Sequence, residues 1–215
     1  MRGRRVGLLT NHTGRVRTPG GEVRSTADRL HAHPEVELVA LFSPEHGIRG
    51  DAEAGEAVDS STDAATGLPV HSLYGGTRRP TPQMLSGVEV LVFDIQDVGA
   101  RYYTYLWTMT LAMEAAAEAG IPFVVLDRPN PIGGHAVQGN VLDPAFASFV
   151  GRFAVPMRHG LTPGEMARLV AGEYGVGDRD ALAVVPLQGW QRTMEYVETG
   201  LPWTAPSPNM PDEVS

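Results

Sequence analysis

The sequence of 215 residues contains no cysteine, and all 17 of its basic residues are arginine, so it contains no lysine. Without cysteine the chain has no disulfide, no thiolate ligand for a metal and no cysteine nucleophile. Without lysine it has no Schiff-base chemistry and no phosphate-binding lysine of the Walker type. The redox state of its compartment stays open, because a chain without cysteine is compatible with either side of a membrane.

The chain also lacks a concentration of positive charge and a long apolar run. Its 25 acidic residues outweigh the scattered basic ones, giving a net charge of -8, so we expect no nucleic-acid partner. No stretch approaches the roughly 20 apolar residues of a membrane-spanning helix. The positive start of the chain is followed by only four consecutive apolar residues, too few for a signal peptide. We therefore expect no membrane span and no leader, and localisation and oligomeric state stay open.

Motifs that bind common cofactors and metals are missing too. The loop Asn11 to Gly14 follows the first apolar run but does not have the GxGxxG spacing of a dinucleotide site. The sequence has no P-loop, no GxSxG elbow and no HExxH metal motif, although His12, His46, His159 and the aspartates leave a metal as a weak alternative. We expect neither a cofactor nor a metal.

Short apolar runs that alternate with helical patterns predict an α/β fold. The run VEVLVFDI is apolar on both faces, which is typical of a central parallel strand covered by helices. The expected strands are Val6–Thr10, Val36–Phe42, Leu68–Tyr74, Val88–Ile95, Ile121–Leu126 and Ala181–Leu187. Between them lie the helices expected at Thr26–Ala32, Thr104–Ala119 and Leu161–Ala171, a single helical turn at Pro82–Ser86, and long loops before Arg24 and over Gly50–Gly67.

Helix ends are signalled by their capping residues. Ser25 or Thr26 suits the start of the first helix, and Gly120 closes the second. Thr162 with Glu165 three residues later forms a capping box around the third, which indicates a structural role for Glu165. The lengths predict a Rossmann-like domain over residues 1–188, with helices on both faces of a mostly parallel sheet. The Trp- and Pro-rich residues 189–215 then read as the start of a connection to a second, truncated domain.

The stretch VELVALFSPEHGIRG places a carboxylate and an imidazole at the carboxyl end of a strand, where ligands gather in parallel α/β sheets. Pro44 and Gly47 restrict the backbone around Glu45 and His46 in a way that surface loops rarely need. Glu45 is therefore the first candidate for chemistry. The alternatives are a carboxylate that accepts hydrogen bonds from its own loop and a histidine that serves as a hydrogen-bonded spacer.

Three further strand ends carry polar side chains, and four such clusters on one edge of a sheet predict a shared site. Asp94 offers a second carboxylate for acid–base work, or alternatively caps a helix. The remaining candidates for ligand contact are polar or aromatic residues that suit a sugar carrying a carboxylate: Asn11, Gln96, Asp97, Arg101, Tyr102, Tyr103, Asp127, Arg128, Asn130 and His159. Core packing would account for some of the tyrosines, and an internal ion pair for Asp127 with Arg128.

Five separated motifs, FSPEHGIRG, FDIQDVGARYYTY, LDRPNPIGG, RHGLTPGE and SPNMP, resemble in this order the exo-β-N-acetylmuramidase family of the NamZ type, glycoside hydrolase family 171. The resemblance runs from about Arg5 to Pro211. It implies a Rossmann-like domain joined to a smaller carboxyl-terminal domain, with the active cleft between them. It also implies release of N-acetylmuramic acid from the non-reducing end of peptidoglycan fragments, with Glu45 at the position of the family's catalytic glutamate. Members of this family continue well beyond SPNMP, so the resemblance implies that the second domain is missing from this sequence.

These observations lead to the hypothesis of a glycosidase in which Glu45 protonates the glycosidic oxygen. Asp94 or the substrate's own N-acetyl group would stabilise charge at the anomeric carbon, and Arg101 or Arg128 would pair with the lactyl carboxylate. One alternative is a wall-sugar binding domain without hydrolysis. A weaker one is a nucleotide-binding protein, which the missing phosphate loop disfavours. Retention or inversion depends on distances between carboxyl groups that a sequence does not contain.

Overall fold

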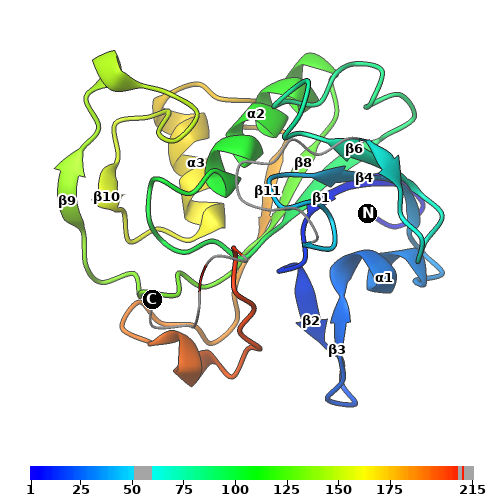
Figure 1. Ribbon diagram of the computed structural model, residues 1–215, viewed down its shortest axis with the longest axis horizontal. Coiled ribbons are helices and arrows are strands. Elements are labelled where there is room, and N and C mark those ends of the chain that lie inside the picture. The colour runs from blue at the N-terminus through cyan, green and yellow to red at the C-terminus, as the bar shows by residue number, and fades with distance from the viewer. Residues whose placement is uncertain (51–59, 208–209, 211–215) are drawn as a thin grey trace.

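The computed structural model describes residues 1–50, 60–207 and 210. A seven-stranded sheet with the order β11-β8-β7-β1-β4-β6-β5 forms its centre (Figure 1). These strands are β1 (Arg5–Thr10), β4 (Glu37–Ser43), β5 (Ser61–Thr62), β6 (Pro69–Ser72), β7 (Val90–Asp94), β8 (Phe123–Leu126) and β11 (Leu182–Val185). All neighbours in this sheet run parallel except β5 and β6. The predicted mostly parallel α/β fold is confirmed.

Helices cover both faces of the sheet, as expected. The helix α1 (Thr26–His31) lies on one face, and α2 (Tyr105–Glu118) and α3 (Pro163–Glu173) lie on the other (Figure 1). The side chains of each strand alternate between the two faces. In β7, Val90 and Val92 pack toward α1, whereas Leu91 and Phe93 pack toward α2. Both faces are therefore apolar, and this explains why β7 is buried along its whole length.

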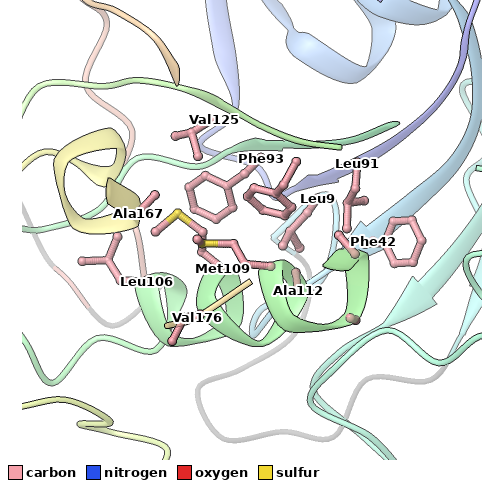
Figure 2. Close-up of a cluster of buried hydrophobic side chains, with 14 of the residues drawn as sticks. Leu9, Phe42, Leu91, Phe93, Leu106, Met109, Ala112, Val125, Ala167 and Val176 are labelled. Atoms are coloured by element: carbon pink, nitrogen blue, oxygen red, sulfur yellow. The ribbon is translucent and has the colours of Figure 1, made fainter. Parts of the chain in front are cut away.

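The larger core lies between the sheet and the pair α2 and α3. Figure 2 shows Phe93 and Val125 from the strands packed against Met109 of α2 and Ala167 of α3. Each large apolar side chain buried in this way stabilises the fold by about 1.5–3 kcal/mol relative to its exposed state. This core fixes the sheet under α2, and the first residues of α2 border the candidate site described below.

The predicted helix caps are confirmed. The Ser25 hydroxyl accepts the N–H of Ala27 at 3.1 Å, and Thr162 and Glu165 form the expected capping box at the start of α3. At the end of α2, Gly120 has a φ of 66°, which glycine adopts without the cost of a Cβ. The next residue, Ile121, donates its N–H to the carbonyl of Ala116 and so closes the helix.

Two hairpins were not among the expected strands, and one of them lies in the loop expected before Arg24. The residues before Arg24 include the antiparallel strands β2 (Arg15–Arg17) and β3 (Val23–Ser25). A second pair, β9 (Gln138–Val141) and β10 (Pro156–Arg158), forms an arm beside α3 (Figure 1). The connection within this arm contains the 3-10 helix η1 (Pro144–Phe146), and a second one, η2 (Tyr196–Thr199), follows β11. These strands are short, and β2 and β9 are mostly exposed, so apolar alternation does not reveal them.

The single helical turn predicted at Pro82–Ser86 is present, although it does not continue into a regular helix. Residues 82–87 form successive hydrogen-bonded turns, with the N–H of Leu85 on the carbonyl of Thr81, and Gly87 at a φ of 84° turns the chain into β7. Half of the loop expected over Gly50–Gly67 falls on residues 51–59, outside the described residues, and the described remainder includes the short strand β5. Within residues 1–50, 60–207 and 210, no helix is long and apolar enough to cross a membrane.

Candidate active site

Four polar strand ends meet at one edge of the sheet. The strands β8, β7, β1 and β4 are consecutive neighbours and run parallel, so their carboxyl ends lie on the same side. Thr10 of β1, for example, is in register with Asp94 of β7. The four strand ends therefore share one edge, whereas the expected shared site stays a prediction, because the side chains at that edge fall into two groups with different surroundings.

A tight turn presents Glu45 at the end of β4. The N–H of Gly47 donates to the carbonyl of Pro44 at 3.3 Å, which closes the turn around Glu45 and His46. His46 has a φ of 71° and is the one non-glycine residue with a positive φ in the described part of the chain. Such a backbone is strained for a residue with a Cβ and is found most often at functional sites. His46 is buried, whereas Glu45 is half-buried at the rim of a cavity.

Two hydroxyl groups hold the Glu45 carboxylate. The Thr104 hydroxyl donates to Oε2 of Glu45 at 2.9 Å. Thr104 directly precedes α2, so the helix sets the position of this donor. The Tyr74 hydroxyl, two residues beyond β6, also hydrogen-bonds to Glu45, and the pKa of Tyr74 is raised first by burial and then by the Glu45 charge. A phenol in this state keeps its proton and remains a donor.

The cavity beside Glu45 has a volume of about 250 Å³. Four tyrosines form much of its wall, and the centres of adjacent rings among Tyr102, Tyr103 and Tyr105 lie 6.1 Å apart. The wall consists of Glu45, His46, Tyr74, Tyr102, Tyr103, Thr104, Tyr105, Val150 and Ser207. Aromatic faces with polar tips beside a carboxylate suit a sugar ring, which has apolar C–H faces and a hydroxylated edge.

The end of the described chain completes one side of this cavity. The segment Trp203–Ser207 returns to the sheet edge, where the Tyr105 hydroxyl donates to the carbonyl of Pro206. Nε2 of His12, after β1, lies 2.8 Å from the carbonyl of Ala205. Ser207, the first residue of the SPNMP motif, thereby reaches the cavity wall. The boundary expected at residue 188 stays a prediction, and these contacts tie later residues closely to the sheet.

Asp94 and Arg128 form a buried ion pair. Nε of Arg128 donates to Oδ1 of Asp94 at 2.6 Å, and Nη2 donates to Oδ2 at 3.0 Å, a bidentate arrangement. Burial opposes the charge on Arg128, but Asp94 outweighs it, and the pKa of Arg128 is raised. Nη2 also donates to the carbonyl of Arg15. Neither charge of this pair is directed at the cavity wall described above.

The alternative of an ion pair between Asp127 and Arg128 is wrong. The Asp127 carboxylate instead accepts the N–H of Gly164 at 2.8 Å and the hydroxyl of Thr162 at 2.9 Å. It therefore caps the amino end of α3, where a negative charge is favoured by the helix dipole. Burial nevertheless raises the pKa of Asp127, because the buried charge is costly even when hydrogen-bonded.

Asp97 and His159 face each other in the interior. Oδ2 of Asp97 lies 3.9 Å from Nε2 of His159, and it accepts the N–H of Gly99 at 2.8 Å. Burial raises the pKa of Asp97 to about 7 and lowers that of His159 to about 4. The pair connects the loop after β7 to the loop before α3, and the first of these loops leads to Tyr103 and Thr104.

The remaining candidates bind backbone groups. Asn11 accepts the N–H and hydroxyl of Thr13. Gln96 donates to the carbonyls of Asp97 and Pro129, and Asn130 donates to that of Leu161. Nη1 of Arg101 donates to the carbonyls of Asn140 and Val155. Of the predicted residues, the structure therefore places Glu45, His46, Tyr102 and Tyr103 at the cavity and the others in the framework around it.

Five wall residues are absent from the predicted set: Tyr74, Thr104, Tyr105, Val150 and Ser207. Tyr74 lies at the end of a predicted strand, so the reasoning that selected Glu45 would have reached it. Thr104 and Tyr105 belong to a motif in which only the preceding residues were chosen. Val150 carries no sequence signal. No group of three or more His, Asp and Glu side chains within the described ranges is arranged to hold a metal ion.

Comparisons with known proteins identify the family of this chain. Residues 6–214 match the family model described as "Exo-beta-N-acetylmuramidase NamZ, N-terminal". The chain belongs to this family. A curated relative, the peptidoglycan β-N-acetylmuramidase NamZ of Bacillus subtilis (strain 168), is 53% identical over 211 residues, which are 98% of this chain and 50% of the relative.

Two solved structures of DUF1343 family proteins from Bacteroides fragilis NCTC 9343 have the same fold. One is 51% identical with a TM-score of 0.89, and the match covers 99% of this chain and 53% of that protein. The other is 35% identical with a TM-score of 0.74, covering 90% and 50% respectively. The chain thus spans about half the length of the relatives it matches. The NamZ family membership and the Rossmann-like fold rest on these matches together with the observed sheet.

Proposed function

We propose that Glu45 is the general acid and base of a glycoside hydrolase that releases N-acetylmuramic acid from the non-reducing end of peptidoglycan fragments. The observation that carries this proposal is a carboxylate held by two hydroxyl groups at the rim of a tyrosine-lined cavity. The activity named for the Bacillus subtilis relative supports the choice of reaction. Because the chain spans half of that relative, the proposal applies to a protein of the relatives' full length.

Cleavage of a glycosidic bond needs a proton on the leaving oxygen as the bond breaks. Thr104 and Tyr74 fix the direction of the Glu45 carboxyl group, which reduces the reorganisation needed to reach that oxygen. Tyr102 and Tyr103 would contact the apolar face of the sugar ring. His46 lies on the same cavity wall and is our second candidate for contact with the reacting groups.

The ion pair between Asp94 and Arg128 makes Asp94 a poor candidate for stabilising charge at the anomeric carbon. A carboxylate that is 2% exposed and accepts two hydrogen bonds from Arg128 is poorly placed to act as a nucleophile. The substrate's own N-acetyl group is then the better candidate for this role, as in glycosidases that use substrate assistance. We propose that Asp94 and Arg128 instead support the edge of the sheet from which the site is built.

The test is the release of free N-acetylmuramic acid from a chromogenic muramide or from a muramic acid–glucosamine disaccharide. It is run on this chain and on a version extended to the length of the relatives. Release by the extended protein supports the proposal. Saturable sugar binding without release by either protein would replace it with the alternative of a wall-sugar binding domain, and the absence of both would refute it.

A further inference from the structure

One arginine beside the cavity has no ion pair or hydrogen bond among residues 1–50, 60–207 and 210. Arg78 is exposed in the loop after β6, and its guanidinium carbon lies 4.0 Å from the centre of the Phe149 ring and 5.4 Å from that of Tyr74. The two rings are 6.1 Å apart and tilted by 44°. Arg78 is therefore held by two aromatic faces, and no carboxylate in the described part of the chain neutralises it.

Both aromatic supports adjoin the Glu45 cavity. Tyr74 is part of the cavity wall, and so is Val150, the residue after Phe149. Both charges act on the Tyr74 hydroxyl. Burial raises the pKa of Tyr74 most, the Glu45 charge raises it further, and the Arg78 charge opposes this rise. Arg78 thus stacks on a residue of the cavity wall, Tyr74, whose other neighbour is Glu45.

The two arginines predicted to bind the lactyl carboxylate both donate hydrogen bonds within the fold. Arg128 donates from Nε and Nη2 to the Asp94 carboxylate, and from Nη2 also to the carbonyl of Arg15. Arg101 donates to two backbone carbonyls of the β9–β10 arm. The predicted alternatives for binding the lactyl carboxylate therefore both have internal partners, and Arg78 does not.

Stacking and carboxylate binding use different parts of a guanidinium. The rings contact its flat face, which leaves the five N–H groups along its edge free to form a bidentate pair with a carboxylate. N-acetylmuramic acid differs from N-acetylglucosamine by a lactyl ether that ends in a carboxylate. We propose that Arg78 determines specificity for the carboxylate-bearing sugar by pairing with this group. This inference rests on the proposed function, because it assumes that the sugar occupies the Glu45 cavity.

The test compares the binding of free N-acetylmuramic acid with that of its lactyl methyl ester, which has nearly the same shape but no charge. Calorimetry is performed on this chain and on the version extended to the relatives' length. The Kd of the acid should be lower than that of the ester by about 10-fold or more, because the ester cannot form the charged, hydrogen-bonded pair with Arg78. Equal affinities, or no binding of either sugar to either protein, would overturn the inference.

Variants then assign the preference to one side chain. Arg78→Gln should bind acid and ester equally, and Arg78→Lys should keep part of the preference, because it retains the charge but not the bidentate edge. Arg79→Gln is the matched control. Arg79 is the next residue in the chain, but its guanidinium pairs with Glu118, so this variant should keep the full preference for the acid over the ester. A full preference in Arg78→Gln, with thermal melting confirming that both variants are folded, would assign carboxylate recognition elsewhere.

The two proposals fail in different ways. If the unmodified protein prefers the acid through Arg78 but releases no sugar, the hydrolytic function is refuted and the recognition stands. If sugar is released with the same kcat/KM by Arg78→Gln as by the unmodified protein, the hydrolase stands and the role of Arg78 is refuted.

Discussion

Oδ2 of Asp97 lies 3.9 Å from Nε2 of His159, with both side chains buried. Nδ1 of His159 accepts the N–H of Leu161 at 3.1 Å, so the hydrogen of the neutral ring is on Nε2 and faces Asp97. Burial moves the two pKa values in opposite directions, to about 7 for Asp97 and about 4 for His159. Between these values the folded pair holds one proton, on the carboxyl group, and carries no charge.

The unfolded pair also holds one proton over much of this range, but on the imidazole. The ordinary pKa values are 3.8 for the aspartate and 6.5 for the histidine. Folding therefore moves a proton from His159 to Asp97 without changing the number bound between pH 4 and 6.5. Because the slope of stability against pH depends on the difference in bound protons, the two contributions largely cancel in the intact protein.

Replacing one member of the pair should expose the contribution of the other. In His159→Gln, Asp97 has a raised folded pKa, so the folded state binds more protons and stability should fall as pH rises from about 4 to 7. In Asp97→Asn, His159 has a lowered folded pKa, so stability should rise from about pH 4 to 6.5. Each change should amount to roughly 2–4 kcal/mol, at 1.36 kcal/mol per pKa unit.

Urea denaturation at several pH values measures these slopes. Parallel profiles for both variants, or slopes of the same sign, would contradict a shared proton. The double variant, which removes both titrations, is the control and should follow the profile of the unmodified protein over the same range.

Glu45→Gln should lower the release of N-acetylmuramic acid by roughly 10²-fold or more, because the amide cannot transfer the proton that the glycosidic oxygen needs. Sugar binding should change little, since glutamine keeps the shape of the side chain. The measurement is turnover of a chromogenic muramide by the extended protein, with Glu118→Gln as a control for an exposed carboxylate on α2. Unchanged turnover in Glu45→Gln would remove Glu45 from the chemistry.

Thr104→Val should reduce kcat about 10-fold, because it removes the donor that orients the Glu45 carboxylate while keeping the shape of the side chain. Thr104→Ser restores the hydroxyl group and should recover most of this activity. Steady-state kinetics of both variants distinguish orientation from packing. If serine and valine lower kcat equally, the methyl group and not the hydrogen bond is what matters.

Arg128→Met should destabilise the fold by about 3–5 kcal/mol, because it leaves the buried Asp94 carboxylate without its partner. Arg79→Met breaks the exposed pair with Glu118 and should cost no more than about 1 kcal/mol. Urea midpoints of the two variants provide the comparison. Similar shifts would mean that the Asp94 charge finds other compensation when Arg128 is absent.

Features that depend on neighbouring residues in the chain were predictable from the sequence. The burial of β7 on both faces follows from the run VEVLVFDI, and the cap of α3 follows from Thr162 and Glu165. Glu45 was found because strand and turn signals meet at that position, and parallel strands collect their ends on one edge. The same rule applied to the β6 strand would have identified Tyr74.

Features that depend on tertiary partners were not predictable. Asp94 has the same appearance in the sequence whether it binds substrate or pairs with Arg128, which lies 34 residues away. Arg78 was missed because the sequence does not distinguish it from its neighbour Arg79. Only the fold brings Arg79 to Glu118 and Arg78 to two aromatic rings. The exposed hairpins escaped prediction because their pairing leaves few apolar residues to reveal it.

Because Trp203–Ser207 returns to the sheet edge, the residues of the cavity wall are translated at widely separated times. Glu45 and its turn leave the ribosome early, and Thr104 follows with α2, but the wall that includes Ser207 is made more than a hundred residues later. A nascent chain interrupted at residue 188 would therefore lack the part of this wall that Ser207 forms. Ser207 joins the cavity wall only after Trp203–Ser207 is translated and docks on His12 and Tyr105.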